Sequence, residues 1–275
     1  MEYETLWHRL TPLYETSEAK AIIRWMLDVR FGLSLADILC GKVNELSATD
    51  KKDMEDIMQR LEKGEPVQYV IGVADFYGRQ FHVAPGVLIP RPETEELCRW
   101  IVEEVGNKSF ILDIGTGSGC IAITLALDMP EAKVTAWDIS DDALQIAQKN
   151  AKTLGAGIRF EQQDILNYPP DGCYDLIVSN PPYIQPKECD GMAKNVLDYE
   201  PHQALFTPDD QPIIFYQRIG DYAWQHLKSG GELYFELNPL TADEVSDYLQ
   251  RLGFSEIEIR QDQFGKQRFL KATKI

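Results

Sequence analysis

The sequence lacks the features that mark a metal site, a disulfide framework or a membrane span. Its five cysteines are scattered without a CxxC pair, and its four histidines have no HExxH or paired spacing. No apolar stretch approaches the length of a membrane span, and the first residues lack a basic region and an apolar core. We expect no metal, no membrane contact, no leader peptide, and a cytoplasmic protein whose cysteines are small buried side chains.

Positive charge is also scarce. The chain has 27 Lys and Arg against 44 Asp and Glu, a net charge of −17, and its longest basic run is the pair Lys51-Lys52. Long tracks of nucleic-acid phosphate need clustered cations, so we expect no direct binding of nucleic acid. An acidic field favours a soluble protein steered toward a basic partner, and we expect a monomer.

The hydrophobic pattern predicts helices over residues 1–70. Apolar residues recur at helical spacing from Leu6 to Leu61, before Gly64 and Pro66 end the pattern. Ser34 with Asp37, and Ser47 with Asp50, fit capping boxes at helix starts. We expect a small bundle of about four helices that docks a partner.

A change of period follows over residues 71–90. The stretches 69–72, 75–83 and 86–89 alternate around glycine-rich turns, which predicts a β-hairpin connector. Pro90-Arg91-Pro92-Glu93-Thr94-Glu95 comes next, where Glu93 or Thr94 begins a helix that runs to Val105. The prolines on both sides of Arg91 hold this loop rigid.

Strands and helices alternate over the remaining domain, residues 91–275. This order predicts an α/β fold with a doubly wound, mostly parallel seven-stranded sheet. The turn at 262–265 is so short that the last two strands must be antiparallel. The expected strands are 110–114, 133–137, 157–161, 174–179, 231–237, 254–260 and 267–272, and the expected helices are 94–105, 119–128, 141–154, 212–228 and 241–252.

A glycine-rich loop joins the first of these strands to a helix. Its spacing is GxGxG rather than the GxGxxG of dinucleotide sites, and Asp113 precedes it directly. A carboxylate there repels a pyrophosphate but suits a ligand with an ammonium and a sulfonium, such as S-adenosylmethionine. The expected cofactor-binding residues are Asp113, Gly115, Thr116, Gly117, Ser118 and Gly119.

Acidic residues follow the next two strands. Asp138 stands where a carboxylate grips ribose hydroxyls, although NAD sites use the same device and a cap for helix 141–154 is the structural alternative. Asp164 suits the adenine amine, with Ile165 on the ring, and its alternative is an ordinary loop carboxylate. Together these residues indicate a nucleoside site.

The motif Asn180-Pro181-Pro182-Tyr183 ends a buried strand. Proline stops the strand, which leaves the Asn180 side chain and nearby backbone carbonyls as acceptors at the sheet edge, with an aromatic ring nearby. Such a site suits a planar group with an NH₂. The alternative is a strand-ending turn with a solvent-facing asparagine.

With these motifs the sequence resembles class I S-adenosylmethionine-dependent methyltransferases, and within them the family that methylates a glutamine of peptide chain release factors. The resemblance covers nearly the whole chain, including 65–69, 88–95 and Tyr199-Glu200-Pro201. NPPY is shared with enzymes that methylate adenine in DNA, while PRPETE is more specific, and a sister family acting on a ribosomal protein differs there. The chain departs from the family at 206–212 and 236–239.

The resemblance implies S-adenosylmethionine as cofactor, S-adenosylhomocysteine as product, no metal, and the glutamine of the GGQ motif of release factors as substrate. It implies that Asn180 Oδ1 and the Pro181 carbonyl accept the two N–H groups of that amide, with Tyr183 packed on its plane. Asn180 also borders the cofactor, and Arg91, Pro92 and Glu93 form a possible substrate loop. Alternatives are adenine-N6 methylation of nucleic acid, glutamine methylation of a ribosomal protein, and a scaffold without catalysis.

Overall fold

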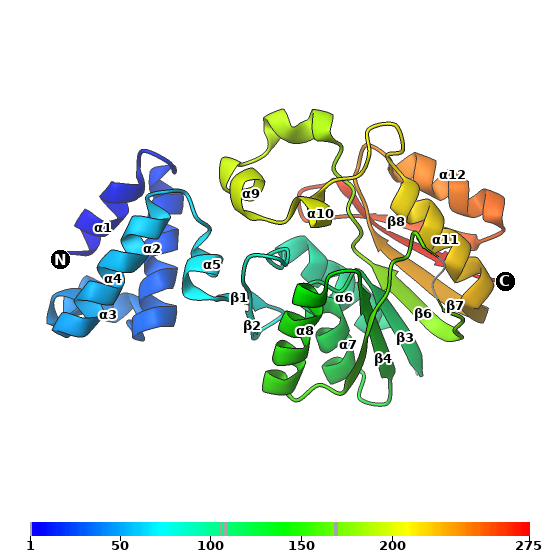
Figure 1. Ribbon diagram of the computed structural model, residues 1–275, viewed down its shortest axis with the longest axis horizontal. Helices are drawn as coiled ribbons and strands as arrows, with labels where there is room; N and C mark the ends of the chain where they lie inside the picture. The colour runs from blue at the N-terminus through cyan, green and yellow to red at the C-terminus, as the bar shows by residue number, and fades with distance from the viewer. Residues whose placement is uncertain (1, 105, 107–108, 168–169) are drawn as a thin grey trace. The chain divides into compact units, whose positions relative to one another are not determined.

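The computed structural model describes residues 2–104, 106, 109–167 and 170–275. The chain folds as two compact units, one comprising Met1–Val73 with Ala193–Tyr199 and the other Ala74–Met192 with Glu200–Ile275 (Figure 1). The first unit is therefore discontinuous, because a short segment from late in the chain packs with the N-terminal residues.

The first unit is helical. Its core holds fully buried apolar side chains such as Leu6, Ile23 and Met54. Ser34 forms a complete capping box with Asp37. The Ser47 hydroxyl accepts from the Asp50 N–H and donates to the Asp50 carboxylate, but the backbone half of the box is not formed, so the second predicted box is half right. The elements are α1 (Tyr3–Leu10), α2 (Thr16–Phe31), α3 (Leu35–Leu39), the 3-10 helix η1 (Lys42–Glu45), α4 (Ala48–Leu61), α5 (Val67–Ile71) and α9 (Lys194–Tyr199).

Two stretches predicted as extended are not strands. Residues 69–71 lie in α5, because Val67 and Val70, three residues apart, both pack on the bundle core. Residues 86–89 form an irregular loop whose Ile89 N–H donates to the side chain of Glu200 instead of to a neighbouring strand. Only β1 (Val73–Phe76) and β2 (Arg79–His82) pair in this region, so the hairpin prediction holds in part.

The second unit is built on a seven-stranded sheet of order β5-β4-β3-β6-β7-β9-β8. The first five strands in this order are parallel, and β9 is antiparallel to both of its neighbours. The predicted fold is confirmed, including the one reversed strand. The strands are β3 (Phe110–Ile114), β4 (Lys133–Asp138), β5 (Ile158–Gln162), β6 (Tyr174–Ser179), β7 (Leu227–Glu236), β8 (Ser255–Gln261) and β9 (Gln267–Thr273).

Helices cover both faces of this sheet (Figure 1). Successive strand residues point to opposite sides, so Ile111 joins the core with α6, α7 and α8, and Leu112 joins the core with α11 and α12. Both are fully buried, which explains the continuous apolar runs of the strands. The helices are α6 (Pro92–Glu104), α7 (Cys120–Asp128), α8 (Asp141–Leu154), α11 (Ile214–His226) and α12 (Ala242–Leu252). The predicted end of α6 at Val105 lies outside the described residues.

Two further predictions need correction. No helix is predicted between residues 180 and 211, but η2 (Pro186–Gly191), α9 and α10 (His202–Leu205) lie there. Each is too short for its hydrophobic periodicity to be recognised. The cysteines are not uniformly buried, because Cys40 and Cys173 are exposed, Cys189 is half-buried, and only Cys98 and Cys120 are buried.

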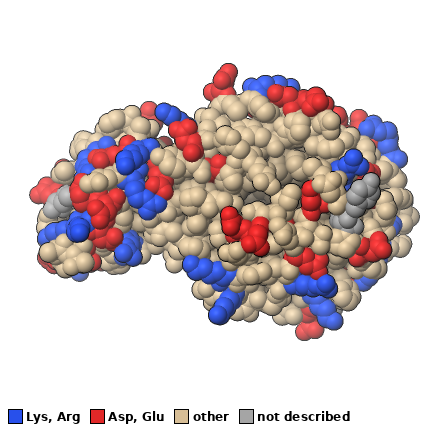
Figure 2. Space-filling model, viewed as in Figure 1, with Lys and Arg blue, Asp and Glu red and all other residues tan. Residues whose placement is uncertain are grey.

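The surface mixes charges of both signs. On the face in Figure 2, the described Lys and Arg side chains are interspersed with Asp and Glu over both units. Within the described ranges, no helix has the length and apolar character needed to cross a bilayer.

Candidate functional site

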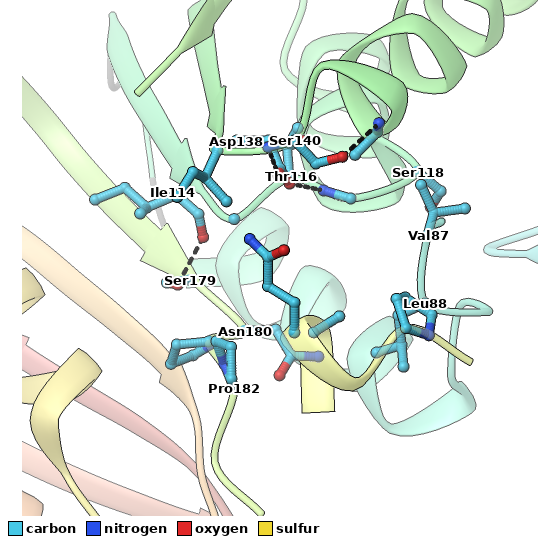
Figure 3. A pocket seen from close by; sticks show the side chains of 18 of the residues that line it. Val87, Leu88, Ile114, Thr116, Ser118, Asp138, Ser140, Ser179, Asn180 and Pro182 are labelled. Carbon is cyan, nitrogen blue, oxygen red and sulfur yellow. Dashed lines mark hydrogen bonds between the residues drawn. The ribbon is translucent and has the colours of Figure 1, made fainter. Parts of the chain in front are cut away.

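A cavity of about 450 Å³ opens in the second unit at the carboxyl ends of β3, β4 and β6 (Figure 3). Chain connections turn in opposite directions on the two sides of β3, toward β4 and toward β6, which is where open α/β sheets bind ligands. The sheet topology therefore brings the glycine loop, the acidic residues and the NPPY motif to one place. The residues that line the cavity include Val87, Leu88, Arg91, Thr94, Gly115, Thr116, Gly117, Ser118, Asp138, Ser140, Asp164, Ile165, Ser179, Asn180, Pro181 and Pro182.

The glycine loop has the backbone shape that its sequence requires. Gly115, Gly117 and Gly119 have φ of 76°, 54° and 82°, which favours glycine. A Cβ on Gly119 would lie 3.0 Å from Ile123 Cδ1 and 3.1 Å from Ala147 Cβ, so this glycine lets α7 and α8 pack closely. Gly119 is outside the cavity lining, whereas the other loop residues form part of the wall.

Asp113 is fully buried behind the loop and is not part of the cavity lining. Its Oδ2 accepts from Thr116 Oγ1 at 2.7 Å and from the Ala122 N–H at 3.2 Å, so it braces the loop against α7. Burial raises the pKa of this carboxyl to about 7. Among the described residues its Oδ1 has no hydrogen-bond partner.

Asp138 lines the cavity at the end of β4 (Figure 3). Its Oδ2 accepts from the Gly117 N–H at 2.8 Å and its Oδ1 from the Ser140 N–H at 2.9 Å, and burial raises its pKa. The cap of α8 is Ser140, whose hydroxyl accepts from Ala143 N–H, so the alternative reading of Asp138 as that cap is wrong. Asp138 instead joins the loop to the cavity wall.

Asp164 and Ile165 line the same cavity beyond β5. Asp164 Oδ1 accepts from the Leu166 N–H at 2.9 Å, and its Oδ2 accepts from Asn167 Nδ2 at 2.6 Å. The Gln163 N–H donates to the Asp138 carbonyl at 3.0 Å, which holds this loop beside the end of β4. The two acidic residues that the sequence singles out therefore share one wall.

The NPPY motif is divided between the cavity and the core. Asn180, Pro181 and Pro182 line the cavity, whereas Tyr183 lies outside the lining and packs with the core under α11. The Tyr183 hydroxyl donates to Glu236 Oε1 at 3.1 Å, and burial raises its pKa. Tyr183 is thus part of the core that supports the cavity, and the predicted packing of its ring in the site is not seen.

The proline-rich loop is divided in the same way. Arg91 lines the cavity, whereas Pro92 and Glu93 begin α6 outside the lining. Arg91 pairs with Glu200, which is 1% exposed at its side chain and also accepts from the Ile89 N–H at 3.0 Å. Glu200 thereby fixes the loop that forms one side of the cavity.

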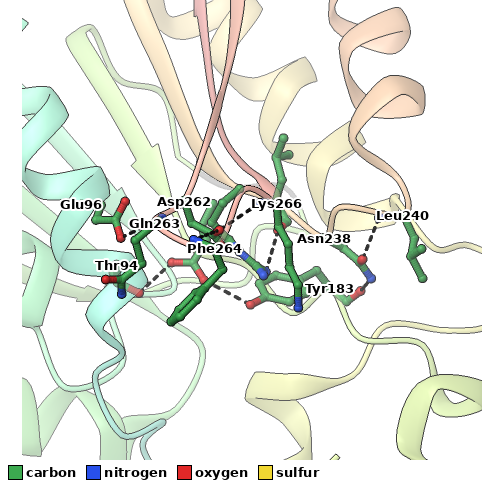
Figure 4. Close-up of polar contacts among 12 residues, drawn as sticks. Thr94, Glu96, Tyr183, Asn238, Leu240, Asp262, Gln263, Phe264 and Lys266 are labelled. Carbon is green, nitrogen blue, oxygen red and sulfur yellow. Dashed lines mark hydrogen bonds and ion pairs between the residues drawn. The ribbon is translucent and has the colours of Figure 1, made fainter. Parts of the chain in front are cut away.

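Two residues at or directly behind the cavity wall, Thr94 and Glu236, carry no recognisable signal in the sequence. Thr94 lines the cavity and donates its hydroxyl proton to Glu236 Oε2 at 2.7 Å (Figure 4). Asn180 Nδ2 in turn donates to Thr94 Oγ1 at 3.4 Å. Neither partner could be found from spacing, because Thr94 and Glu236 are separated by 142 positions in the chain.

Known proteins resemble this chain along its length. Residues 8–72 match the family PrmC N-terminal domain, and residues 93–205 match the family Methyltransferase small domain. A release factor glutamine methyltransferase of Bacteroides thetaiotaomicron is 45% identical over 269 residues, covering 96% of each chain. One of Flavobacterium psychrophilum is 38% identical over 270 residues, covering 96% of this chain and 95% of its own.

The chain belongs to the release factor glutamine methyltransferase family. A solved methyltransferase from Pyrococcus furiosus shares 20% identity, covers 72% of this chain and 90% of its own, and superposes with a TM-score of 0.54, which shows the fold. Members of this family are S-adenosylmethionine-dependent enzymes, and the chain is a methyltransferase of that class.

The cavity suits S-adenosylmethionine in size and in chemistry. Ligand pockets of drug-sized molecules enclose roughly 300–1,000 Å³ and are mostly apolar with a few placed polar groups. Here the carboxylates of Asp138 and Asp164 offer acceptors for hydroxyl and amine groups, while Val87, Leu88 and Ile165 give apolar surface. The set includes no cluster of cations for a pyrophosphate, and Arg91 is already paired with Glu200.

Proposed function

We propose that this methyltransferase transfers the methyl group of S-adenosylmethionine to the side-chain amide nitrogen of the glutamine in the GGQ motif of peptide chain release factors. Support comes from relatives named release factor glutamine methyltransferase, which align over nearly the whole chain. The observation that carries the proposal is the placement of Asn180 in the wall of the cavity, close to the glycine loop and with its own NH₂ bonded to Thr94.

An amide nitrogen is a poor nucleophile, because its lone pair is delocalised into the carbonyl group. S-adenosylmethionine supplies an electrophilic methyl group on a sulfonium. In our proposal Asn180 Oδ1 and the Pro181 carbonyl accept the two N–H groups of the glutamine, which fixes the nitrogen and turns its lone pair toward that methyl. A new N–C bond forms as the S–C bond breaks, and one amide proton leaves to water.

Positioning supplies most of the rate enhancement in this mechanism. A bound pair of reactants held in line gains several kcal/mol of the barrier from entropy already lost on binding. The prolines after Asn180 fix the backbone whose carbonyl accepts, because each restricts φ to about −65°. Val87 and Leu88 place apolar side chains on the opposite wall and keep water from the reacting atoms (Figure 3).

A label-transfer experiment tests the proposal. The enzyme is incubated with S-adenosylmethionine carrying a labelled methyl group and, separately, with a release factor, with the same factor whose GGQ glutamine is replaced by alanine, and with DNA. We expect label only in the unaltered factor. Label that persists after the glutamine is replaced, or that enters DNA, would contradict the proposed substrate.

A nucleic-acid adenine is the second candidate, because its exocyclic NH₂ lies on a planar ring and offers the same two donors to Asn180 and Pro181. A net charge of −17 opposes it, since adenine in a duplex must be extruded and held by contacts to phosphate. A ribosomal-protein glutamine is the third candidate, and a purified ribosomal-protein fraction in the same assay separates it from the release factor.

A further inference from the structure

Glu236 is a buried carboxylate behind the cavity wall. It ends β7, is 2% exposed, and is not among the residues that line the cavity. Its Oε2 accepts from Thr94 Oγ1 at 2.7 Å and its Oε1 accepts from the Tyr183 hydroxyl at 3.1 Å (Figure 4). Glu236 therefore joins α6 to the NPPY motif from a third element.

The charge of Glu236 fixes the direction of both hydrogen bonds. An ionised carboxylate only accepts, so Thr94 and Tyr183 must each donate their single hydroxyl proton to it. Tyr183 keeps that proton, because burial and the nearby Glu236 raise its pKa. Burial raises the pKa of Glu236 overall, against the opposing effects of the Thr94 hydroxyl, Arg268 and the Tyr183 hydroxyl. The carboxylate form is the one that satisfies the observed geometry, because each of its two oxygens has a hydroxyl directed at it.

The direction of the Thr94–Glu236 hydrogen bond also determines the orientation of the Asn180 side chain. Because the Thr94 proton points at Glu236, the Thr94 oxygen presents only lone pairs to Asn180, whose Nδ2 lies 3.4 Å away. An Asn180 side chain turned by 180° would place its oxygen against that oxygen, two acceptors without a proton between them. Such a mismatch between buried polar groups is costly, so the amide keeps its nitrogen on Thr94 and its Oδ1 free.

We propose that Glu236 is a positioning residue for methyl transfer, which acts through Thr94 to keep Asn180 Oδ1 directed at the acceptor amide. The inference rests on the proposed function, in which that oxygen accepts from the substrate NH₂. Without this relay, Asn180 can present its own NH₂ to the substrate NH₂, and two donors then oppose each other. Glu236 contacts neither substrate nor cofactor, so its influence on the reaction passes through its neighbours.

A double-mutant cycle tests the relay. Glu236→Gln has the same shape but carries an NH₂ that Thr94 or Tyr183 must accept from, and Thr94→Val removes the hydroxyl that transmits direction. We expect each single change to lower kcat by about tenfold to a hundredfold while the Kd for S-adenosylmethionine stays within about threefold. When Glu236→Gln is added to Thr94→Val, kcat should fall by less than about a further threefold, because the relay is already absent.

Thr94→Ser keeps the hydroxyl and is the conservative variant, so it should recover most of the kcat that Thr94→Val loses. A second measurement needs no substrate. In ¹⁵N-labelled protein the side-chain NH₂ signal of Asn180, identified by its absence in Asn180→Asp, should exchange slowly with solvent. Exchange should become faster in Glu236→Gln and in Thr94→Val, and should stay slow in Thr94→Ser.

Two results would overturn the relay. The first is full additivity of the two changes in kcat, which a merely structural carboxylate predicts. The second is an Asn180 exchange rate that neither change alters. An unaltered enzyme that leaves the GGQ glutamine unmethylated would instead refute the proposed substrate, and the exchange measurement would still decide the orientation of Asn180.

Discussion

Two contacts fix the position of Asn180: the hydrogen bond from its side chain to Thr94, and strand β6, which ends at the residue before it. Ser179, the last residue of β6, donates its hydroxyl to the Ile114 carbonyl at 2.6 Å, which ties this strand end to β3. In our proposal the Asn180 carbonyl oxygen, together with the Pro181 carbonyl, accepts from the acceptor amide. A single side chain thus carries most of the predicted recognition of the acceptor amide.

Replacing Asn180 with alanine should lower kcat by about a hundredfold or more, because an acceptor aimed at the reacting group is lost. The Kd for S-adenosylmethionine should change little, since Asp138 and the glycine loop are untouched. Steady-state kinetics and calorimetry measure the two effects. Asn44→Ala, on the exposed surface of the first unit, is the matched control. Normal turnover of Asn180→Ala would remove this residue from the mechanism.

Asp138 has the complementary role in our account. Asp138→Ala should weaken S-adenosylmethionine binding by about tenfold or more, because it removes an acceptor for the ribose and frees the Gly117 N–H from its 2.8 Å bond. Isothermal titration calorimetry gives the affinity directly. Asp141→Ala, an exposed change in the first turn of α8, serves as control. An unchanged affinity in Asp138→Ala would refute the ribose assignment.

The buried Asp113 carboxyl makes the free energy of unfolding depend on pH, and its burial fixes the sign of that dependence. Its pKa is raised to about 7 in the folded protein, whereas an aspartate in an unfolded chain titrates near pH ~3.9. Between these values the folded state binds more protons, so the contribution of Asp113 to the free energy of unfolding falls as the pH rises and is lowest above pH ~7.

Asp113→Asn removes this titration. The free energy of unfolding of the variant minus that of the unaltered protein should increase between pH ~4 and pH ~8, by on the order of a few kcal/mol. Urea unfolding at several pH values measures the difference. A difference that is constant with pH would show that the Asp113 carboxyl is not perturbed.

At the scale of elements, the loop before α6 depends on Glu200. This side chain accepts from the Ile89 N–H and pairs with Arg91, and both partners belong to the stretch that lines one side of the cavity. Arg91 is 32% exposed, so solvent can replace part of the ion pair, whereas the Ile89 N–H has no such route. The backbone hydrogen bond is therefore the costlier contact to lose.

Glu200→Gln keeps an acceptor for Ile89 and should lower the free energy of unfolding by less than about 1 kcal/mol. Glu200→Ala leaves that buried N–H unpaired and should cost about 1–3 kcal/mol. Chemical unfolding measures the free energy of unfolding of both variants, with the exposed Asp198→Ala as control. Equal stability of the two Glu200 variants would contradict the assignment.

The elements themselves were largely predictable. Short apolar runs such as 174–179 that alternate with helix-length segments indicate interior strands of a parallel sheet, and the turn at 262–265 requires the last pair to be antiparallel. Residues 69–71 were misread because a helix of five residues gives too short a period to separate from alternation.

The site was predictable only where it follows strand ends. Asp138 is the last residue of β4, Asp164 lies two residues beyond β5 and Asn180 directly follows β6, and parallel strands bring their carboxyl ends together. Thr94 and Glu236 belong to different elements far apart in the chain, and their hydrogen bond has no local signature. Asp113 and Tyr183 support the cavity from outside its lining, and a sequence motif does not show which of its side chains reach a cavity.

At the scale of the molecule, the two units are linked by the chain more than once. Residues 193–199 leave the second unit, pack in the first, and return at Glu200. Within the first unit the Tyr199 hydroxyl donates to the Lys63 carbonyl at 3.0 Å. The residue after this anchor is Glu200, the carboxylate that fixes the cavity loop. The sequence predicts that the N-terminal bundle docks a partner. This chain segment would then connect the docking unit covalently to the residue that fixes the cavity loop.

The central claim is that the methyl group ends on the amide nitrogen of one glutamine. Mass spectrometry of a proteolysed release factor, after incubation with the enzyme and S-adenosylmethionine, tests it most directly. We predict a single added methyl group, located by fragmentation to the side chain of the GGQ glutamine, and about a hundredfold slower formation of it with Asn180→Ala. A methyl group on any other residue, or none on the factor while DNA is methylated, would contradict the account.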